Sequence, residues 1–129
     1  VMGRGAAYAD IDGDGDLDIA MTTLDGPAVL LRNDVPPGRH WLRVRATGSA
    51  SNRSGIGAVV RVTSASGTQW QMVRSGSSYA SQSELTLTFG LGADTRVSRV
   101  EVQWPSGRTQ VLPGVEADRV LQVAEPAAR

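Results

Sequence analysis

The chain has 129 residues, a formal net charge of zero, 5% aromatic residues and no cysteine. This length allows one ordinary domain, or a small domain with a fragment of another. The balanced charge excludes a basic nucleic-acid-binding surface over the whole chain, and the lack of cysteine excludes disulfides and thiolate metal sites. All of the basic residues are arginine, which is typical of a GC-rich bacterial genome.

Short runs of β-forming residues, separated by Gly, Ser, Asp, Asn and Pro, follow one another along the chain. No window of helical length keeps a 3.6-residue apolar period, so the sequence predicts an all-β protein. No stretch approaches the roughly 20 apolar residues that a membrane span needs. In chain order, the expected strands are 5–9, 18–23, 28–32, 41–47, 58–64, 68–74, 85–90, 97–104, 109–113 and 119–124.

The prolines and glycine of residues 35–38 cannot continue a central strand, so these residues form a linker. The linker separates a piece at residues 1–34 from a larger domain at 39–125, which is followed by a tail at 126–129. In the larger domain apolar and polar residues alternate, as in Leu42, Val44 and Ala46. This period of two predicts an antiparallel β-sandwich or a barrel-like domain with its own core.

Five aspartates lie within the nine residues 10–18. Carboxylates at loop positions 1, 3, 5 and 9, a backbone carbonyl at 7 and a glycine at 6 form an oxygen cage suited to Ca²⁺. An EF-hand is excluded, because Met21 occupies its twelfth position and the flanking residues are β-formers. A solvated acidic turn without an ion is the alternative. The predicted metal ligands are Asp10, Asp12, Asp14, Asp16 through its backbone carbonyl, and Asp18.

Residues 5–20, GAAYADIDGDGDLDIA, resemble the calcium-binding FG-GAP/VCBS repeat of β-propellers. The resemblance implies that residues 1–34 are a partial propeller, a terminal repeat whose calcium loop spans residues 10–18. Because two or three strands alone are marginal in water, we expect upstream repeats of the same parent protein as partners. Val1 is then an excision point, and an export signal precedes it. Abundant calcium implies an extracellular, cell-surface or periplasmic location.

Four strings in the larger domain resemble the ASPIC/UnbV domain: 52–58 NRSGIGA, 74–82 RSGSSYASQ, 89–92 FGLG and 102–107 VQWPSG. This resemblance points to the cartilage acidic protein-like family, in which the domain follows FG-GAP/VCBS propellers. It implies no catalytic activity. We therefore expect the larger domain to bind a partner or to cap the propeller.

Polar residues of these strings are candidates for partner binding, but turn stabilisation is the favoured explanation. The candidates are Asn52, Arg53, Arg74, Ser77, Ser78 and Tyr79. An enzyme or a biosynthetic accessory protein is an alternative, and it requires Ser77, Ser78, Tyr79 and Arg53 to line one pocket. His40 is the only histidine, which makes a catalytic triad improbable. Trp70 lies in mid-strand and is expected to pack in the core.

From residue 35 onward, eleven arginines face six acidic residues. They form either a patch for an extracellular protein, an anionic glycan or the chain's own acidic loop, or a set of scattered solvated side chains. The predicted function is a calcium-stabilised, non-catalytic, secreted binding or adhesion module, without nucleic acid as a partner. A purely structural scaffold is the remaining alternative.

Overall fold

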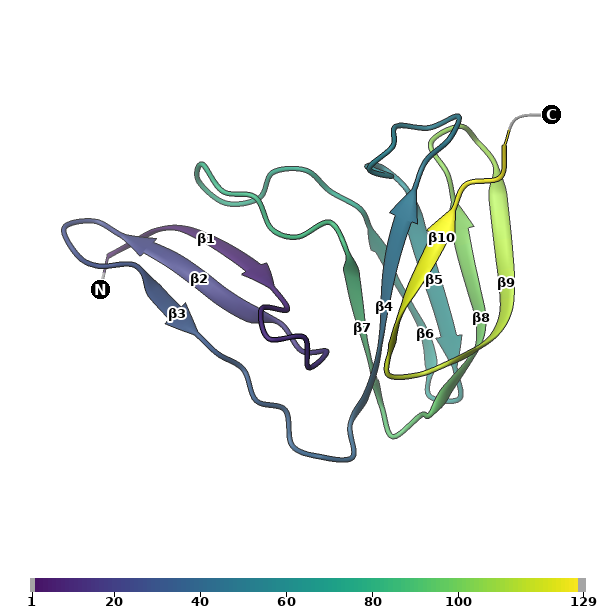
Figure 1. Ribbon diagram of the computed structural model, residues 1–129, viewed down its shortest axis with the longest axis horizontal. Coiled ribbons are helices and arrows are strands. Elements are labelled where there is room, and N and C mark those ends of the chain that lie inside the picture. Colours follow the sequence, from purple (N-terminus) through teal and green to yellow (C-terminus); the bar gives the residue numbers. More distant parts are fainter. Residues whose placement is uncertain (1, 128–129) are drawn as a thin grey trace.

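The computed structural model describes residues 2–127, and every regular element in this range is a β-strand. The all-β prediction is therefore confirmed. Val1 and residues 128–129 of the expected tail lie outside the described residues. Figure 1 shows a small sheet beside a larger two-layered body, with the chain crossing between them after β3. The strands are β1 (Gly3–Ala9), β2 (Asp18–Thr23), β3 (Val29–Leu31), β4 (His40–Thr47), β5 (Val59–Ser64), β6 (Gly67–Met72), β7 (Leu87–Gly92), β8 (Arg96–Gln103), β9 (Thr109–Glu116) and β10 (Arg119–Ala124).

The first three strands form an antiparallel sheet in the order β1-β2-β3, called here the N-terminal sheet. Strand β2 pairs with both neighbours and places Ile19 opposite Tyr8 and Leu31. Those three side chains are exposed. Among residues 2–34 only Gly5, Gly15 and Asp18 are buried, so this sheet has no apolar core of its own.

The remaining strands form two stacked sheets, called here the sandwich, in the orders β10-β4-β7 and β6-β5-β8-β9. Alternate residues of both sheets point inward, as a period of two requires. Both sheets keep free edges, so the sandwich alternative describes the domain. One pair departs from the antiparallel pattern, since β10 runs parallel to β4. The core comprises Leu42, Val44, Ala46, Ala58, Val60, Val62, Val73, Leu87, Phe89, Leu91, Val97, Val100, Val102, Trp104, Val115 and Val123.

The expectation that Trp70 packs in the core is wrong, because its side chain is 59% exposed. Trp70 lies opposite Arg61 of β5, on the outward face of the sheet. The neighbouring residues of β6 take the inward positions. There the Gln69 and Gln71 amides donate to the backbone oxygens of Gly90 and Thr88 in β7, over 2.7 and 2.6 Å. Strand β6 therefore joins the two layers through polar side chains. Across residues 2–127 no helix has the length and apolarity that crossing a bilayer requires.

Candidate metal centre

The loop between β1 and β2 is shaped by its own carboxylates. Gly13 and Gly15 adopt φ angles of +80° and +94°, which glycine reaches without steric cost. Their amides donate to the Asp10 carboxylate over 2.7 and 3.1 Å. At the other end of the loop, Asp18 accepts hydrogen bonds from the amides of Ile11 at 3.0 Å and Asn33 at 2.9 Å. Asp18 thus joins the start of the loop to the chain that follows β3.

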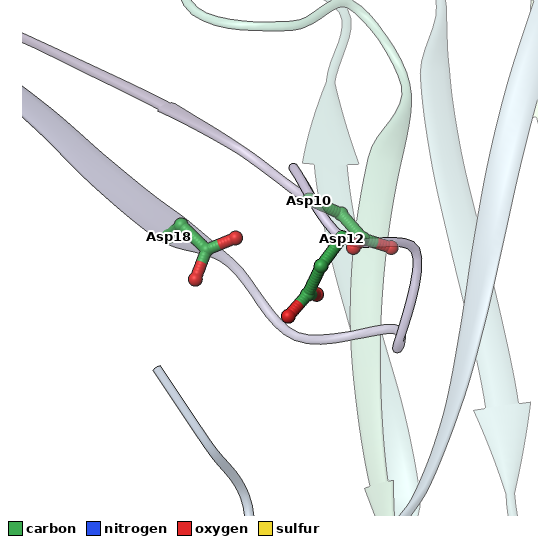
Figure 2. Close-up of side chains that lie close together, drawn as sticks. All are labelled: Asp10, Asp12 and Asp18. Atoms are coloured by element: carbon green, nitrogen blue, oxygen red, sulfur yellow. The ribbon is translucent and has the colours of Figure 1, made fainter. Parts of the chain in front are cut away.

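The structure brings the aspartates together in two overlapping groups. One carboxylate oxygen from each of Asp10, Asp12 and Asp18 lies within 4.8 Å of the other two. Figure 2 shows Asp12 on the loop close to Asp10, with Asp18 at the start of β2. The second group, by the same measure, contains Asp12, Asp14 and Asp34. Asp12 therefore occupies the centre of the acidic cluster.

Asp34 is a member of the cluster that the sequence analysis missed. Strand β3 pairs with β2 and places Leu31 opposite Ile19. The residues that follow β3 are thereby returned to the loop, as the bond from the Asn33 amide to Asp18 also shows. The hairpin register was the signal that could have identified Asp34.

The negative charges of the cluster repel one another, and its surroundings shift the pKa values of its carboxylates. Burial, followed by the negative charges of Asp14 and Asp18, raises the pKa of Asp12 above its ordinary value. Hydrogen bonds from the amides of Asn33 and Ile11 lower the pKa of Asp18, which therefore stays ionised. Such a cluster gains stability from any cation that approaches its oxygens.

Asp16 belongs to neither group. Its Oδ2 accepts a hydrogen bond of 2.8 Å from the Val35 amide in the linker. Its Oδ1 is buried without a hydrogen-bond partner among the described residues. Burial raises the pKa of Asp16, although the Val35 amide opposes this effect. The prediction that Asp16 acts through its backbone carbonyl stays a prediction.

The acidic loop also contacts the sandwich through a network of Asp10, Arg43 and Glu84, called here the docking network. The Arg43 side chain is 11% exposed and the Asp10 side chain 1%. Nη1 of Arg43 lies 3.3 Å from Oδ2 of Asp10, and Nη2 pairs with the Glu84 carboxylate. The same Glu84 carboxylate accepts a hydrogen bond of 3.2 Å from the Asp10 amide. Arg43 therefore sits between two carboxylates, one from each unit of the fold.

Gly15 of the loop lies directly against Trp41 of β4. A Cβ atom built on Gly15 would lie 1.9 Å from Cε2 of the indole, so no side chain fits there. Trp41 is held in turn by Asp118, whose carboxylate accepts from the Trp41 amide at 3.3 Å and whose amide donates to the Trp41 carbonyl at 2.7 Å. His40 Nδ1 lies 2.7 Å from Oδ2 of the same Asp118.

The free edge of β1 is covered by residues 77–84, called here the serine segment. The hydroxyls of Ser78 and Ser83 accept hydrogen bonds from the amides of Ala6 and Tyr8 at 3.0 and 3.1 Å. The Glu84 amide donates to the Tyr8 carbonyl at 3.1 Å. An unpaired strand edge is thus satisfied by side-chain hydroxyls of the sandwich domain.

The other residues predicted for partner binding separate into different environments. Ser77 Oγ lies 3.3 Å from Ser83 Oγ, while the ring of Tyr79 is exposed beneath the Arg4 guanidinium at 4.5 Å. Ser77 and Ser78 line a cavity beside β1, whereas Arg53 lines another cavity at the end of β4. These side chains therefore do not form the single pocket that the enzymatic alternative required.

Asn52 stabilises its own turn. Its side-chain amide donates to the Ile56 carbonyl at 2.7 Å and accepts from the Ile56 amide at 2.9 Å. Arg74 is exposed, and no ion pair of Arg74 occurs within residues 2–127. The arginines as a whole do not form one patch, since Arg43 reaches the acidic loop while Arg61 lies on the outward face of β5.

The structure defines an extended β-sandwich that carries a docked acidic hairpin. The family described as ASPIC and UnbV matches residues 48–129, and the chain belongs to this family. Cartilage acidic protein 1 of Mus musculus is 33% identical over 131 residues, and the protein of that name from Xenopus tropicalis is 32% identical over 129 residues. Each alignment covers 96% of this chain and 20% of the relative.

The chain spans about a fifth of the length of these curated relatives. Because the alignments cover 96% of the chain, they include most of the N-terminal sheet, which lies outside the family match. The relatives are vertebrate proteins, so the expectation of a bacterial source stays a prediction.

Proposed function

We propose that this chain is a calcium-stabilised, non-catalytic module that works outside the cytoplasm. The N-terminal sheet is a terminal repeat of the FG-GAP/VCBS type, and the ASPIC/UnbV sandwich receives it. One observation carries this proposal: Asp10 belongs both to the acidic cluster and to the docking network. A cation that binds the cluster therefore fixes the loop in the shape that the sandwich contacts.

The oxygen donors suit calcium. Ca²⁺ takes six to eight oxygen ligands in a flexible arrangement, whereas Mg²⁺ demands a compact octahedron. Asp12 and Asp18 offer carboxylate oxygens close to Asp10, and Asp14 and Asp34 lie beside Asp12. Oδ2 of Asp10 is occupied by the Gly15 amide and by Arg43, but Oδ1 accepts only the Gly13 amide and has a second lone pair for a metal. The backbone carbonyl of Asp16 completes the proposed set.

An extracellular, cell-surface or periplasmic location follows from this chemistry. Calcium sites of extracellular modules bind at about 10⁻⁴–10⁻³ M, concentrations that the cytosol does not sustain. The cluster gathers its ligands from an exposed loop, and Asp12 and Asp14 are themselves exposed. Such a site suits calcium that is abundant and permanently present.

A non-catalytic role is supported by the way the candidate nucleophiles are used. Ser78 accepts a backbone hydrogen bond from β1, and Ser77 lies against Ser83. His40 is paired with Asp118 at a distance from this segment in the fold, near Trp41. The serine segment therefore serves contact between the two units rather than nucleophilic attack.

The N-terminal sheet also leaves apolar side chains for a further partner. Tyr8, Ile19 and Leu31 are all exposed, and they lie opposite one another across the three strands, on one face of the sheet. Exposed apolar surface of this kind marks an interaction face. We include upstream propeller repeats of a longer parent protein as the occupants of this face, because the relatives are about five times as long as this chain.

Thermal unfolding of the chain in chelator, in millimolar calcium and in equal magnesium tests the proposal. The Asp12→Asn variant removes a charge from the centre of the cluster, and Asp25→Asn, in the exposed β2–β3 turn, is the matched control. We expect calcium alone to raise the melting temperature of the wild type and of Asp25→Asn. The gain is about 2.7 kcal/mol when calcium exceeds its dissociation constant about a hundredfold.

Asp12→Asn should lose most of this gain, while its stability in chelator stays close to that of the wild type. A full calcium response in Asp12→Asn, or an equal response to magnesium in the wild type, would refute the ligand assignment.

A further inference from the structure

A second cavity, of about 600 Å³, lies where β4 ends, beside the loop seen above this strand in Figure 1. Two arginines line it, Arg45 and Arg53, together with the hydroxyl-bearing residues Thr47, Ser54 and Thr86. Among residues 2–127, no acidic side chain lines this cavity. Its chemistry is therefore opposite to that of the acidic loop.

The two guanidinium groups are not neutralised within the described chain. Neither Arg45 nor Arg53 forms an ion pair or a side-chain hydrogen bond within residues 2–127. Arg43, two residues before Arg45 and on the same face of β4, is paired with both Asp10 and Glu84. Like charges that face one cavity repel each other, and an anion placed between them removes this repulsion.

The backbone that carries Arg53 is held rigidly. Its carbonyl accepts a hydrogen bond of 3.1 Å from the Gly48 amide, and the Asn52 side chain bridges to Ile56 on the other side. Gly55 has a φ angle of +67°, and a Cβ there would lie 2.9 Å from that of Ala46 in β4. The loop is thus closely seated on β4, so its backbone loses little conformational entropy when Arg53 binds a ligand.

The far end of the same loop is fixed by Glu125, which is buried. Its Oε2 accepts from the amides of Ser49 and Ser51 at 2.8 and 2.7 Å. These bonds tie the loop to the end of β10. Strand β10 pairs with β4 along the edge opposite to β7. The loop that carries Arg53 is therefore fixed both to β4 and to the end of β10.

We propose that this cavity binds an acidic polysaccharide, with Arg45 and Arg53 holding its carboxylate or sulfate groups. A guanidinium binds either group through two parallel hydrogen bonds. The hydroxyls of Thr47, Ser54 and Thr86 line the same cavity as the two cations and are suited to sugar hydroxyls. A cavity that offers both cations and hydroxyls matches a polymer that carries both anionic and hydroxyl groups.

This proposal rests on the extracytoplasmic module proposed above and gives it an external partner, but it uses none of the calcium ligands. The two proposals can therefore fail separately. Binding of the full chain to four polymers is measured by isothermal titration calorimetry at physiological salt. The probes are chondroitin sulfate, which carries carboxylates and sulfates, polygalacturonate, which carries carboxylates alone, neutral dextran, and polyglutamate as an acidic peptide.

The wild type should bind chondroitin sulfate or polygalacturonate and should not bind dextran. The double variant Arg45→Gln/Arg53→Gln should bind at least tenfold more weakly, with an unchanged melting temperature. Arg61→Gln, an exposed arginine on the other sheet, should bind like the wild type. Asp12→Asn should also retain binding, which separates this site from the calcium loop.

Three results would overturn the proposal. They are the absence of binding to both acidic polysaccharides, an equal loss of affinity in Arg61→Gln, and tighter binding of polyglutamate than of either polysaccharide. The last result would assign the cavity to an acidic peptide. Comparing the two acidic polysaccharides shows whether carboxylate or sulfate is the preferred group.

Discussion

The sandwich and the N-terminal sheet are stabilised by different kinds of interaction. The sandwich buries sixteen apolar residues between two sheets, whereas the N-terminal sheet buries no apolar side chain among residues 2–34. The N-terminal sheet instead depends on strand pairing, on carboxylates that accept backbone amides, and on contacts with the sandwich. The comparison teaches that an apolar core supports one unit, while polar contacts, charges and a proposed ion support the other.

The boundary between the two units is polar, because the N-terminal sheet offers it no buried apolar side chain. Arg43, Glu84 and the serine hydroxyls reach across it, and Gly15 lies against Trp41 so closely that no side chain fits between them. Polar contacts depend on geometry more steeply than apolar burial does. We therefore expect substitutions at the boundary to release the N-terminal sheet while the sandwich remains folded.

The largest expected effect sharpens the contrast between the two units. Phe89 is completely buried in the sandwich, and Phe89→Ala should lower the free energy of unfolding by about 3–5 kcal/mol through lost burial and the cavity left behind. Ile19→Ala, at an exposed apolar position of the N-terminal sheet, should change it by about 0.5 kcal/mol at most. Urea denaturation measures both. Equal costs would show that the N-terminal sheet is held by apolar packing after all.

The docking network should give the next largest effect. Arg43→Met leaves the buried Asp10 carboxylate and the partly buried Glu84 without their cation. Loss of one partner from a buried ion pair costs about 3 kcal/mol or more. Hydrogen exchange of the Ala6 and Tyr8 amides reports undocking of β1, and both should exchange faster in this variant.

Arg45→Met is the matched control, because Arg45 lies on the same face of β4 without an ion pair among the described residues. Its amide exchange should follow the wild type. Faster exchange of the β1 amides in Arg45→Met, or unchanged exchange in Arg43→Met, would contradict the role given to the docking network.

Substituting two glycines of the acidic loop distinguishes the cost of backbone strain from the cost of a steric clash with Trp41. Both Gly13 and Gly15 have positive φ angles, so alanine at either position costs about 1 kcal/mol in the backbone. A Cβ on Gly13 meets nothing within 4 Å, whereas one on Gly15 must displace the Trp41 indole. Gly15→Ala should therefore cost more than Gly13→Ala and should alone shift tryptophan fluorescence. Similar spectra for the two variants would show that the loop does not rest on Trp41.

Glu125 supplies a smaller, pH-dependent effect within the sandwich. Burial by itself raises its pKa, but hydrogen bonds from Ser106, Ser51 and Ser49 outweigh burial and lower the pKa to about 2. An unfolded glutamate has a pKa of about 4.3. The ionised group therefore stabilises the fold fully above about pH 4.3, and this stabilisation is lost as pH falls toward 2.

Glu125→Gln should melt below the wild type at pH 7, and the difference should shrink between pH 4 and pH 2. Glu116→Gln is the control, because Glu116 is exposed and paired only with the exposed Arg96 among the described residues. A difference between Glu125→Gln and the wild type that is constant from pH 7 to pH 2 would exclude the carboxylate as its source.

The sequence predicted those features that depend on residues close together in the chain. The alternation of Leu42, Val44 and Ala46 identified the inward face of β4, because burial in a strand follows a period of two. The convergence of Asp10, Asp12 and Asp18 was predictable because a single tight loop carries all three.

Features that depend on the meeting of distant segments could not be predicted. Glu84 reaches Asp10 across 74 positions, and no local pattern marks either residue as the partner of the other. Arg43 was recognised only as one of many arginines, and Asp34 enters the cluster through the register of β3. The orientation of one unit against the other determined these contacts, and periodicity carries no information about it.

The smallest expected effect lies at a residue whose place the sequence did not reveal. Trp70 is 59% exposed, so Trp70→Ala should change the free energy of unfolding by about 0.5 kcal/mol at most. Trp104 is 3% exposed and donates to Gln110 at 3.0 Å, so Trp104→Ala should cost about 3–5 kcal/mol. Fluorescence gives an independent measure, since loss of the exposed Trp70 should shift the mean emission to shorter wavelength. If Trp70→Ala is as costly as Trp104→Ala, the outward face of β6 must be covered in solution, and its tryptophan belongs to an interface.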